Sequence, residues 1–254
     1  MKIYIPTYGR SDHQVTWDNL PYEVQARTTL VVQHRERGKY DESKYKIYVL
    51  PPGIECIGET REWLVSFSTE RYILMLDDDL DFATRRADDP TKFRPSTDND
   101  TRAMLHTIAG SLHEGFKLVG VSGREGANRD TSQFKTATRQ LRVHGIDTEF
   151  FKFRNIRFDR LEFMEDFDVT LQVLELGYPN RVLNGWVHNQ RGGSNAPGGC
   201  SESRTMERQS LAAHELHRLH PNYVTVVQKY SGDWGAPRTD VRIQWKKAYD
   251  SAIK

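Results

Sequence analysis

Short hydrophobic runs separated by polar turns recur through the first half of the chain. The runs are residues 3–5, 29–32, 47–50, 72–76 and 117–122. Apolar residues in these runs are nearly continuous instead of alternating with polar ones, which is typical of strands buried on both faces of a sheet. The pattern therefore predicts five buried strands.

Amphipathic segments follow several of these runs. In residues 59–68, Trp63, Leu64 and Phe67 fall on one helical face, and residues 104–116 repeat the same spacing. Strands that alternate with helices predict an α/β fold with a mainly parallel sheet flanked by helices. In such folds ligands bind beyond the carboxyl ends of the strands.

The second half of the chain has a more varied pattern. We predict strands over residues 150–158 and 181–188, a helix over 165–176 that stops at Gly177, and a helix from about 201 to 219 after the glycine-rich residues 192–199. Residues 124–142 are polar and lack a clear period, which predicts a mobile loop. No repeat or linker divides the chain, so we expect one domain over residues 1–254.

The composition supports this interpretation. Of the 254 residues, 37% are hydrophobic and 11% aromatic, which is enough for a sizeable core and excludes a mainly disordered chain. The two cysteines lie far apart and predict neither a disulfide framework nor a zinc site. No hydrophobic run is long enough to span a membrane, so we expect a soluble, cytoplasmic protein without a membrane partner.

The net charge of +1 hides two segments of opposite charge. Residues 77–100 contain eight acidic and four basic side chains, whereas residues 135–160 contain seven basic and three acidic ones. A polyanionic partner would therefore have to bind a local basic patch instead of the protein as a whole.

Asp77, Asp78 and Asp79 directly follow the run at residues 72–76. Adjacent carboxylates raise each other's pKa unless a cation or hydrogen-bond donors compensate, and Mg²⁺ or Mn²⁺ is the simplest compensation. Asp77 and Asp79 point the same way in an extended segment and are the expected metal ligands, although Asp81 is an alternative to either. The competing interpretation is a solvated acidic loop that caps the next helix.

Two further segments lie where a nucleotide could bind. Pro6, Thr7, Tyr8 and Arg10 belong to the turn after the first strand, whose N–H groups and hydroxyl could hold a nucleotide. Arg61, in the first turn of a predicted helix, could reach an aspartate or a diphosphate as a bidentate donor.

Glu165 and Asp166 open a predicted helix. Acidic residues are favoured there by the helix dipole, but a carboxylate at this position could also act as a general base toward a hydroxyl acceptor. We expect a catalytic role for both, with Asp166 ahead of Glu165.

Histidines occur at the end of one strand and in the last long helix. His188 would complete a coordination sphere left open by two carboxylates and a diphosphate, so it is the expected third metal ligand. His214, His217 and His220 recur every three residues but lack the spacing of a zinc-protease motif, which favours a partly solvated helix face.

In their order along the chain, these motifs resemble those of the GT-A glycosyltransferases. The matching segments are Ile5-Pro6-Thr7-Tyr8-Gly9-Arg10, Gly58-x-x-Arg61, Leu76-Asp77-Asp78-Asp79, Glu165-Asp166-x-Asp168 and His188. The resemblance implies a UDP-sugar bound with Mn²⁺ or Mg²⁺, with Asp78 on the nucleotide side, Arg61 near the diphosphate and Asp166 near the acceptor hydroxyl. Residues 1–123 would form the nucleotide-sugar half and residues 124–254 the acceptor half.

Within this class the chain is most similar to the phage TET-associated glycosyltransferases. This similarity implies a 5-hydroxymethylpyrimidine in DNA as the acceptor and the host cytoplasm as the place of action. The basic residues at 135–160 could neutralise phosphates, and Phe150, Phe151, Phe153 or Tyr178 could stack on a displaced base.

Other functions remain open at this point. The acceptor could be a protein or a saccharide, or the chain could be a catalytically silent DNA-binding module. A sugar-nucleotide pyrophosphorylase would open with a glycine-rich loop where this chain has Pro-Thr-Tyr-Gly-Arg. A phosphatase of the haloacid type would carry its nucleophile on the first strand of its core, not the fourth.

Overall fold

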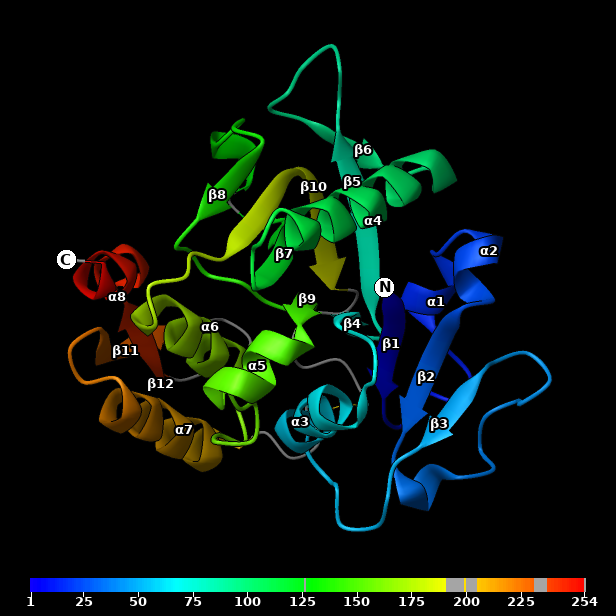
Figure 1. The fold of residues 1–254 in the computed structure, drawn as a ribbon, viewed down its shortest axis with the longest axis horizontal. Helices are drawn as coiled ribbons and strands as arrows, with labels where there is room; N and C mark the ends of the chain where they lie inside the picture. The colour runs from blue at the N-terminus through cyan, green and yellow to red at the C-terminus, as the bar shows by residue number, and fades with distance from the viewer. Residues whose placement is uncertain (126, 191–198, 200–204, 231–236, 254) are drawn as a thin grey trace.

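A computed structural model describes residues 1–125, 127–190, 199, 205–230 and 237–253. Its centre is a ten-stranded sheet with the strand order β3-β2-β1-β4-β9-β7-β10-β5-β6, in which β8 also pairs with β10 (Figure 1). The strands are β1 (Lys2–Thr7), β2 (Thr28–Val32), β3 (Ile47–Val49), β4 (Tyr72–Leu76), β5 (Leu80–Arg85), β6 (Phe93–Pro95), β7 (Leu118–Gly123), β8 (Phe134–Thr136), β9 (Val143–Asp147) and β10 (Arg181–Gln190).

The sheet is mainly parallel, as the alternation of strands and helices predicts. The pairs β1–β2, β2–β3, β1–β4 and β7–β10 are parallel. Strand β9 lies between β4 and β7 and is antiparallel to both, and β5 and β8 are antiparallel to β10. The carboxyl ends of β1, β2, β3, β4, β7 and β10 therefore lie along one edge, where polar side chains follow the strands.

Helices cover both faces of the sheet. They are α1 (Val15–Asp18), α2 (Tyr22–Gln25), α3 (Ile57–Phe67), α4 (Asp98–His113), α5 (Thr148–Arg154), α6 (Glu165–Glu175), α7 (Met206–Leu219) and α8 (Trp245–Ala252), with 3-10 turns at His34–Glu36 and Ala127–Arg129. Side chains of α1–α2 and α4 pack with one set of strand residues, among them Leu74 and Leu76. Side chains of α3, α5 and α6 pack with the alternate set, which includes Ile73 and Met75.

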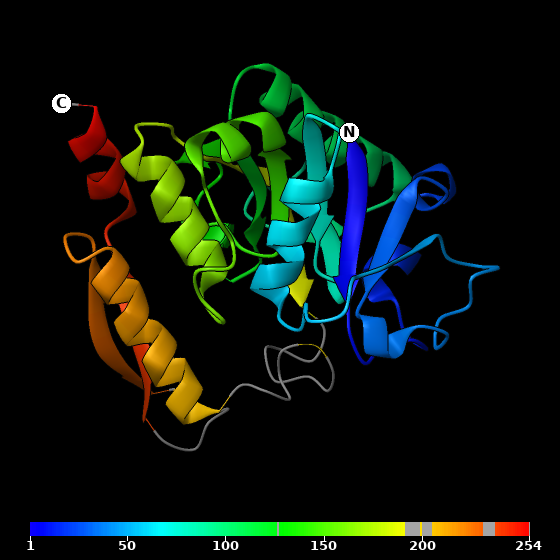
Figure 2. The same ribbon diagram turned by 60° about the horizontal axis from the view of Figure 1, so that its bottom comes forward.

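Residues 205–230 and 237–253 form a C-terminal unit that packs on α6 instead of on the sheet (Figure 2). The unit consists of α7, the antiparallel hairpin β11 (Val224–Tyr230) and β12 (Pro237–Ile243), and α8. Leu171 and Leu174 of α6 contact Leu216 of α7 and Val241 of β12 in one buried cluster. Helix α6 is therefore buried on two sides, between the sheet and this unit.

The structure confirms the predicted strands at residues 3–5, 29–32, 47–50, 72–76, 117–122 and 181–188 to within one or two residues, and the helices near 59–68, 104–116 and 165–176. Strands β5, β6, β8, β9, β11 and β12 were not predicted. The glycine-rich residues 192–199 lie outside the described part of the chain except for Gly199, as do residues 201–204 at the predicted start of α7.

The predicted strand over residues 150–158 is wrong, because this segment begins with helix α5. Phe150 and Phe151 are neighbours and are both buried in the same cluster, which an extended strand cannot achieve. Asp147 caps the helix by accepting a hydrogen bond from the Phe150 N–H group at 3.3 Å. The apparent alternation comes from helical spacing combined with Phe158 in the following loop.

Residues 124–142 were predicted to be a mobile loop, but the described part of this segment contains β8 and a firmly held stretch at 137–142. Asn180 is fully buried, and its side chain exchanges hydrogen bonds with the Thr138 main chain at 2.9 and 3.0 Å. The prediction failed because the partners of these polar residues come from distant parts of the sequence.

Among the described helices, none is both long and apolar enough to cross a membrane.

Candidate active site

The three aspartates form a tight turn at the carboxyl end of β4. Thr16 of α1 holds this turn: its N–H group donates to the Asp78 carbonyl at 3.0 Å, and its hydroxyl accepts from the Leu80 N–H group at 2.8 Å. On the other side, the Asp77 N–H group donates to the Arg142 carbonyl at 3.0 Å. The carboxylates therefore project from a backbone that is held from two directions.

Asp78 and Asp79 are both buried and share one cation. The Arg10 guanidinium contacts both carboxylates and lies 3.0 Å from Asp79 Oδ2. Thr7 donates to Asp78 at 2.6 Å, and Gln190 donates to Asp79 at 2.8 Å. Burial raises the pKa of Asp78 to about 6 and also raises the pKa of Asp79, while Arg10 opposes both shifts.

Arg61 connects the aspartate turn with α6. Its buried guanidinium lies 2.6 Å from Asp77 Oδ1 and also contacts the Glu165 carboxylate. Arg61 is the fifth residue of α3, one turn beyond the capping box between Cys56 and Glu59 that starts the helix. The structure thus brings together Arg61, Asp77 and Glu165. Along the chain, Arg61 lies 16 residues before Asp77 and 104 residues before Glu165.

Asp166, next to Glu165, lies in a different environment. It is half-buried and makes no ion pair with any described residue, whereas Glu165 is bound to Arg61. Its carboxylate accepts a hydrogen bond from the Phe167 N–H group at 2.9 Å. Burial raises the pKa of Asp166, and Arg61 and Arg139 oppose this shift. A carboxylate with a raised pKa is well suited to accept a proton.

His188 is fully buried in β10. Burial, together with the nearby Arg142 and Arg139, lowers its pKa to about 3, so the imidazole is neutral. Neither ring nitrogen has a hydrogen-bond partner of normal geometry among the described residues. His144 of β9 is equally buried and unpartnered, and burial lowers its pKa well below the ordinary value.

The predicted metal ligands differ in how well they fit a cation. Asp79 Oδ1 is buried and has no hydrogen-bond partner among the described residues, and Asp77 is partly exposed, so both carboxylates could turn toward a metal ion. Asp81 accepts a hydrogen bond from Asn19 at 2.9 Å, away from this group. In the described part of the chain, no three His, Cys, Asp or Glu side chains already stand together as a metal site.

An open cleft of about 1250 Å³ connects these residues. Its lining includes ten of the predicted site residues: Pro6, Thr7, Tyr8, Arg10, Arg61, Asp77, Asp78, Asp79, Glu165 and Asp166. His188 is not among the described lining residues, because it lies deeper in the sheet than Gln190. The opposite wall comes from α6 and the C-terminal unit, so the cleft runs between the two halves of the chain.

The cleft also contains residues that the sequence analysis did not select. Gln33 and Arg35 follow β2, and Arg35 lies over the Tyr8 ring with 4.5 Å to its centroid. The rule that polar residues after parallel strands line the site would have found both. Gln190, at the end of β10, follows the same rule, but nothing in the sequence pattern indicated Trp245 of α8.

Several expected acceptor residues lie elsewhere. Phe150 and Phe151 are buried in the core, and Phe153, although exposed, is absent from the described lining of the cleft, as is Tyr178. Much of the basic stretch is paired: Lys135 with Asp130, Arg157 with Asp159, and Arg160 with Asp168. Arg139 and Arg142 do line the cleft, and neither forms an ion pair with a described residue.

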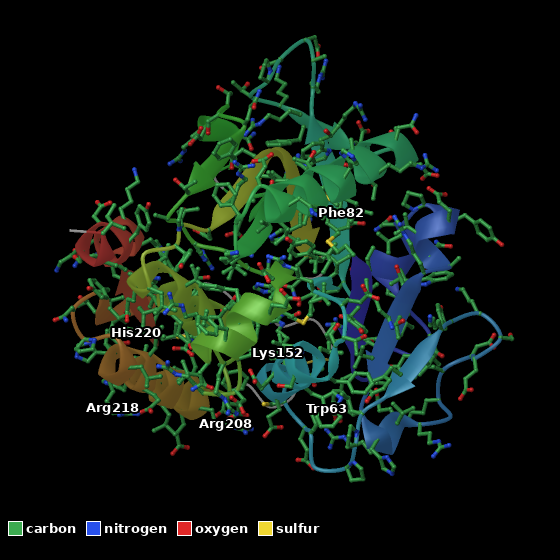
Figure 3. The ribbon with its side chains drawn as sticks, in the orientation of Figure 1. Trp63, Phe82, Lys152, Arg208, Arg218 and His220 are labelled. Carbon is green, nitrogen blue, oxygen red and sulfur yellow. The ribbon has the colours of Figure 1, made fainter. Side chains whose placement is uncertain are left out.

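The prediction of a solvated histidine face is wrong for His220. This residue is buried at the end of α7, with Nε2 2.8 Å from Asp168 and Nδ1 2.6 Å from Glu175. Figure 3 shows His220 and Arg208 toward opposite ends of α7. His220 thus ties the C-terminal unit to α6, whereas His214 and His217 are exposed.

A mainly parallel sheet with the antiparallel strand β9 between β4 and β7, an aspartate turn after β4 and a Glu-Asp pair facing that turn across a cleft define a glycosyltransferase of the GT-A class, which transfers sugar from a nucleotide sugar. The chain belongs to the TET-associated glycosyltransferase family, whose sequence pattern it matches over residues 1–193.

Curated relatives and solved structures agree with this class. The chain is 23% identical over 237 residues to the beta-glucosyl-HMC-alpha-glucosyl-transferase of Enterobacteria phage T6, covering 87% of this chain and 81% of that protein. The phage T2 enzyme of the same name is 22% identical over 236 residues, with the same coverage. The fold also matches glucosyl-3-phosphoglycerate synthase from Mycobacterium tuberculosis, solved with Mg²⁺ and UDP, with a TM-score of 0.53, 12% identity and coverage of 96% and 86%.

Proposed function

We propose that this protein transfers a hexose from a UDP-sugar to the hydroxymethyl group of a 5-hydroxymethylpyrimidine in DNA. The observation that carries the proposal is the cleft in which the aspartate turn and Arg61 face Glu165 and Asp166. The names of the phage T6 and T2 relatives, which act on glucosylated HMC, support the acceptor class. A phage enzyme with this acceptor would act in the host cytoplasm.

In this proposal residues 1–123 bind the donor. Pro6, Thr7 and Tyr8 lie at the carboxyl end of β1 and would contact the nucleoside, as ligands do in open parallel sheets. Arg10 and Arg61 would meet the diphosphate, because both guanidinium groups already lie among the aspartates. Asp78 stays in the nucleotide subsite as the hydrogen-bond partner of Thr7.

A divalent cation, Mn²⁺ or Mg²⁺, belongs to the same proposal. Asp77 and Asp79 would hold it, with His188 as the third ligand, since Asp79 Oδ1 has no hydrogen-bond partner among the described residues and the His188 imidazole is neutral. When bound, the cation would neutralise the negative charge of the departing diphosphate. Arg61 supports the same charge from the side of α3.

Asp166 is the residue that we expect to act on the acceptor hydroxyl. Its neighbour Glu165 is engaged by Arg61, so Asp166 is the carboxylate of this pair that faces the cleft without an ion pair among the described residues. If transfer inverts the anomeric carbon, Asp166 accepts the hydroxyl proton as a general base. A front-face route that retains the configuration needs no such base, and Asp166 would then orient the hydroxyl.

The test is incubation of hydroxymethylcytosine DNA, hydroxymethyluracil DNA and unmodified DNA with a panel of nucleotide sugars, followed by mass spectrometry of the nucleosides. We expect transfer to one of the hydroxymethylated DNAs, and none to unmodified DNA. Transfer only to a protein or saccharide would overturn the DNA acceptor. Calorimetry with UDP and Mn²⁺ tests donor binding separately. If the heat of UDP binding does not depend on Mn²⁺, the proposed metal site is wrong.

A further inference from the structure

Next to Asp166, three side chains from distant parts of the sequence form an aromatic and cationic wall of the cleft. Phe167 of α6 and Trp245 of α8 meet edge to face, with ring centroids 5.7 Å apart and planes at 73°. The Arg139 guanidinium lies 5.2 Å from the Phe167 ring centroid. All three residues line the cleft, and we call them the acceptor wall.

The wall is open to the cleft instead of being sealed in the core. Phe167 and Trp245 are only partly buried, although each also packs at the edge of the cluster between α6 and the C-terminal unit. Arg139 is exposed and has no carboxylate within ion-pair distance among the described residues. Its guanidinium can therefore meet a ligand without first breaking an ion pair.

The position of Arg139 is built into the fold. Thr138, on one side, is bound at its main chain by the buried Asn180. Gln140, on the other side, is 1% exposed and packs so tightly on Gly120 that a Cβ atom there would lie 2.6 Å from Gln140 Cδ. Arg139 thus projects from a rigid segment, which limits the entropy lost when it binds.

Trp245 is positioned just as firmly by the C-terminal unit. The contact of His220 with Asp168 and Glu175 fastens α7 to α6, and α7, β11, β12 and α8 share one buried cluster with α6. The sequence match to the family ends at residue 193, so Trp245 lies outside it. The part of the chain outside that match therefore supplies one side of the wall.

We propose that the acceptor wall receives the target pyrimidine after it leaves the DNA stack. This inference rests on the proposed function and identifies the part of the cleft that would hold the base. The 5-hydroxymethyl group projects into the major groove of a duplex, and in this inference extrusion of the whole base brings it to Asp166 among the residues that line the cleft. Aromatic rings replace the lost stacking, and an arginine beside them adds a cation–π contact and a donor to the base or its phosphate.

The wall also explains how two substrates share one cleft. The volume of the cleft, about 1250 Å³, exceeds the usual volume of a pocket for a single small ligand, roughly 300–1000 Å³. The nucleotide subsite lies at the ends of β1–β4, and the acceptor wall lies across from it on α6 and α8. Asp166 precedes Phe167 in α6 and lines the same cleft, so this inference places it beside the acceptor base.

The test compares Trp245→Leu, Trp245→Phe and Arg139→Gln with the wild type on duplex hydroxymethylcytosine DNA. We expect Trp245→Leu to lower kcat/KM for this DNA about tenfold and Trp245→Phe to retain most of it, with an unchanged KM for the UDP-sugar. Arg139→Gln should lower kcat/KM for the same DNA about three- to tenfold. Because the cost of extruding the base is the same for the wild type and for each variant, both losses should persist when the target lies opposite a mismatch or in single strands, where the wall still contacts the base.

Two variants elsewhere serve as matched controls. Trp63 packs on Phe67 of α3 with ring centroids 6.0 Å apart and is absent from the described lining of the cleft (Figure 3). Arg71 is exposed, lies 5.1 Å from the Tyr72 ring centroid and precedes the amino end of β4, opposite the cleft. Trp63→Leu and Arg71→Gln should leave transfer to DNA unchanged, and thermal unfolding of every variant reports folding.

Each outcome has a distinct meaning. If the wild type modifies DNA but Trp245→Leu equals Trp63→Leu, or if Trp245→Leu loses activity on duplex DNA and none on single strands, the acceptor wall is not a base platform. A loss confined to glucosylated DNA would assign the wall to a sugar ring and overturn the base assignment. A wild-type protein that modifies no DNA would instead refute the proposed function itself.

Discussion

The two sides of the cleft are built on opposite principles. On the donor side, cations and carboxylates are already matched: Arg10 contacts Asp78 and Asp79, and Arg61 contacts Asp77 and Glu165. On the acceptor side, Asp166 and Arg139 have no ion-pair partner among the described residues, and two aromatic rings are partly exposed.

This difference follows from what each side would bind. A diphosphate and a metal ion carry compact charge, so the donor side needs dense polar groups whose own charges cancel when the site is empty. A planar base carries little charge and must be held by surface contact, which aromatic rings provide. The comparison suggests that mutations on the donor side act on charge, whereas mutations on the acceptor side act on stacking and position.

The largest expected effect is that of Asp79→Ala on the donor side. Removing this carboxylate leaves Arg10 and Gln190 without one partner and removes a proposed metal ligand. We expect kcat/KM to fall by about a thousandfold or more, with loss of metal-dependent UDP binding in calorimetry. Asp81→Ala is the matched control, and unchanged transfer and UDP binding in Asp79→Ala would contradict the donor-side assignment.

Asp166→Asn should have the next largest effect, on the acceptor side. If Asp166 is the general base, kcat falls about 100- to 10,000-fold while UDP binding persists. Because burial raises its pKa, the wild-type rate should decline as the pH falls through that raised value, and the variant should lack this acid limb. A variant that keeps full kcat and the same pH profile would favour the front-face route.

Arg61→Lys tests the bridge between the two sides. A lysine keeps the charge but cannot contact Asp77 and Glu165 with two separate donor groups in one plane. We expect kcat to fall about 10- to 100-fold and the free energy of unfolding to fall by about 1–3 kcal/mol, because Arg61 is buried. Chemical denaturation and kinetics on the same samples separate the two effects. A wild-type kcat together with a wild-type free energy of unfolding would contradict the role given to the contacts of Arg61 with Asp77 and Glu165.

The smallest expected effect is that of His220→Gln on the C-terminal unit. Burial alone would lower the pKa of His220, but its hydrogen bonds with Asp168 and Glu175 outweigh burial and raise it. The stabilisation is therefore fully present below the ordinary pKa of about 6.5 and is lost as the pH rises through the higher folded value.

Thermal unfolding from pH 6 to pH 9 checks this. His220→Gln should lower Tm most at pH 6, by an amount that corresponds to about 1–3 kcal/mol, and the difference should narrow at alkaline pH. His214→Gln, an exposed change on the same helix, should leave Tm nearly unchanged. A difference that does not depend on pH would show that His220 is held in its neutral form.

The donor side was predictable from the sequence because its residues are local to strand ends. Asp77–Asp79 follow β4 and Pro6–Tyr8 lie at the end of β1, and a parallel sheet brings such positions to one edge whatever the rest of the fold does. The acceptor side was predictable at Glu165 and Asp166 and, within the basic stretch 135–160, at Arg139 and Arg142, which line the cleft. The aromatic residues chosen from the sequence were wrong for Phe150 and Phe151, since hydrophobicity does not distinguish a core ring from one facing a cleft.

The sequence by itself determined the buried strands, the main helices, the class of the fold and the order of its charged motifs, because hydrophobic periodicity and strand-end positions are local properties. Only the tertiary structure decided that β9 lies antiparallel between β4 and β7, that Arg61 pairs with Glu165, that His220 is buried between two carboxylates, and that Arg139, Phe167 and Trp245 meet beside Asp166. These contacts join residues up to 104 positions apart, as from Arg61 to Glu165. Such contacts depend on how whole helices and strands pack, and a local sequence pattern does not predict that packing.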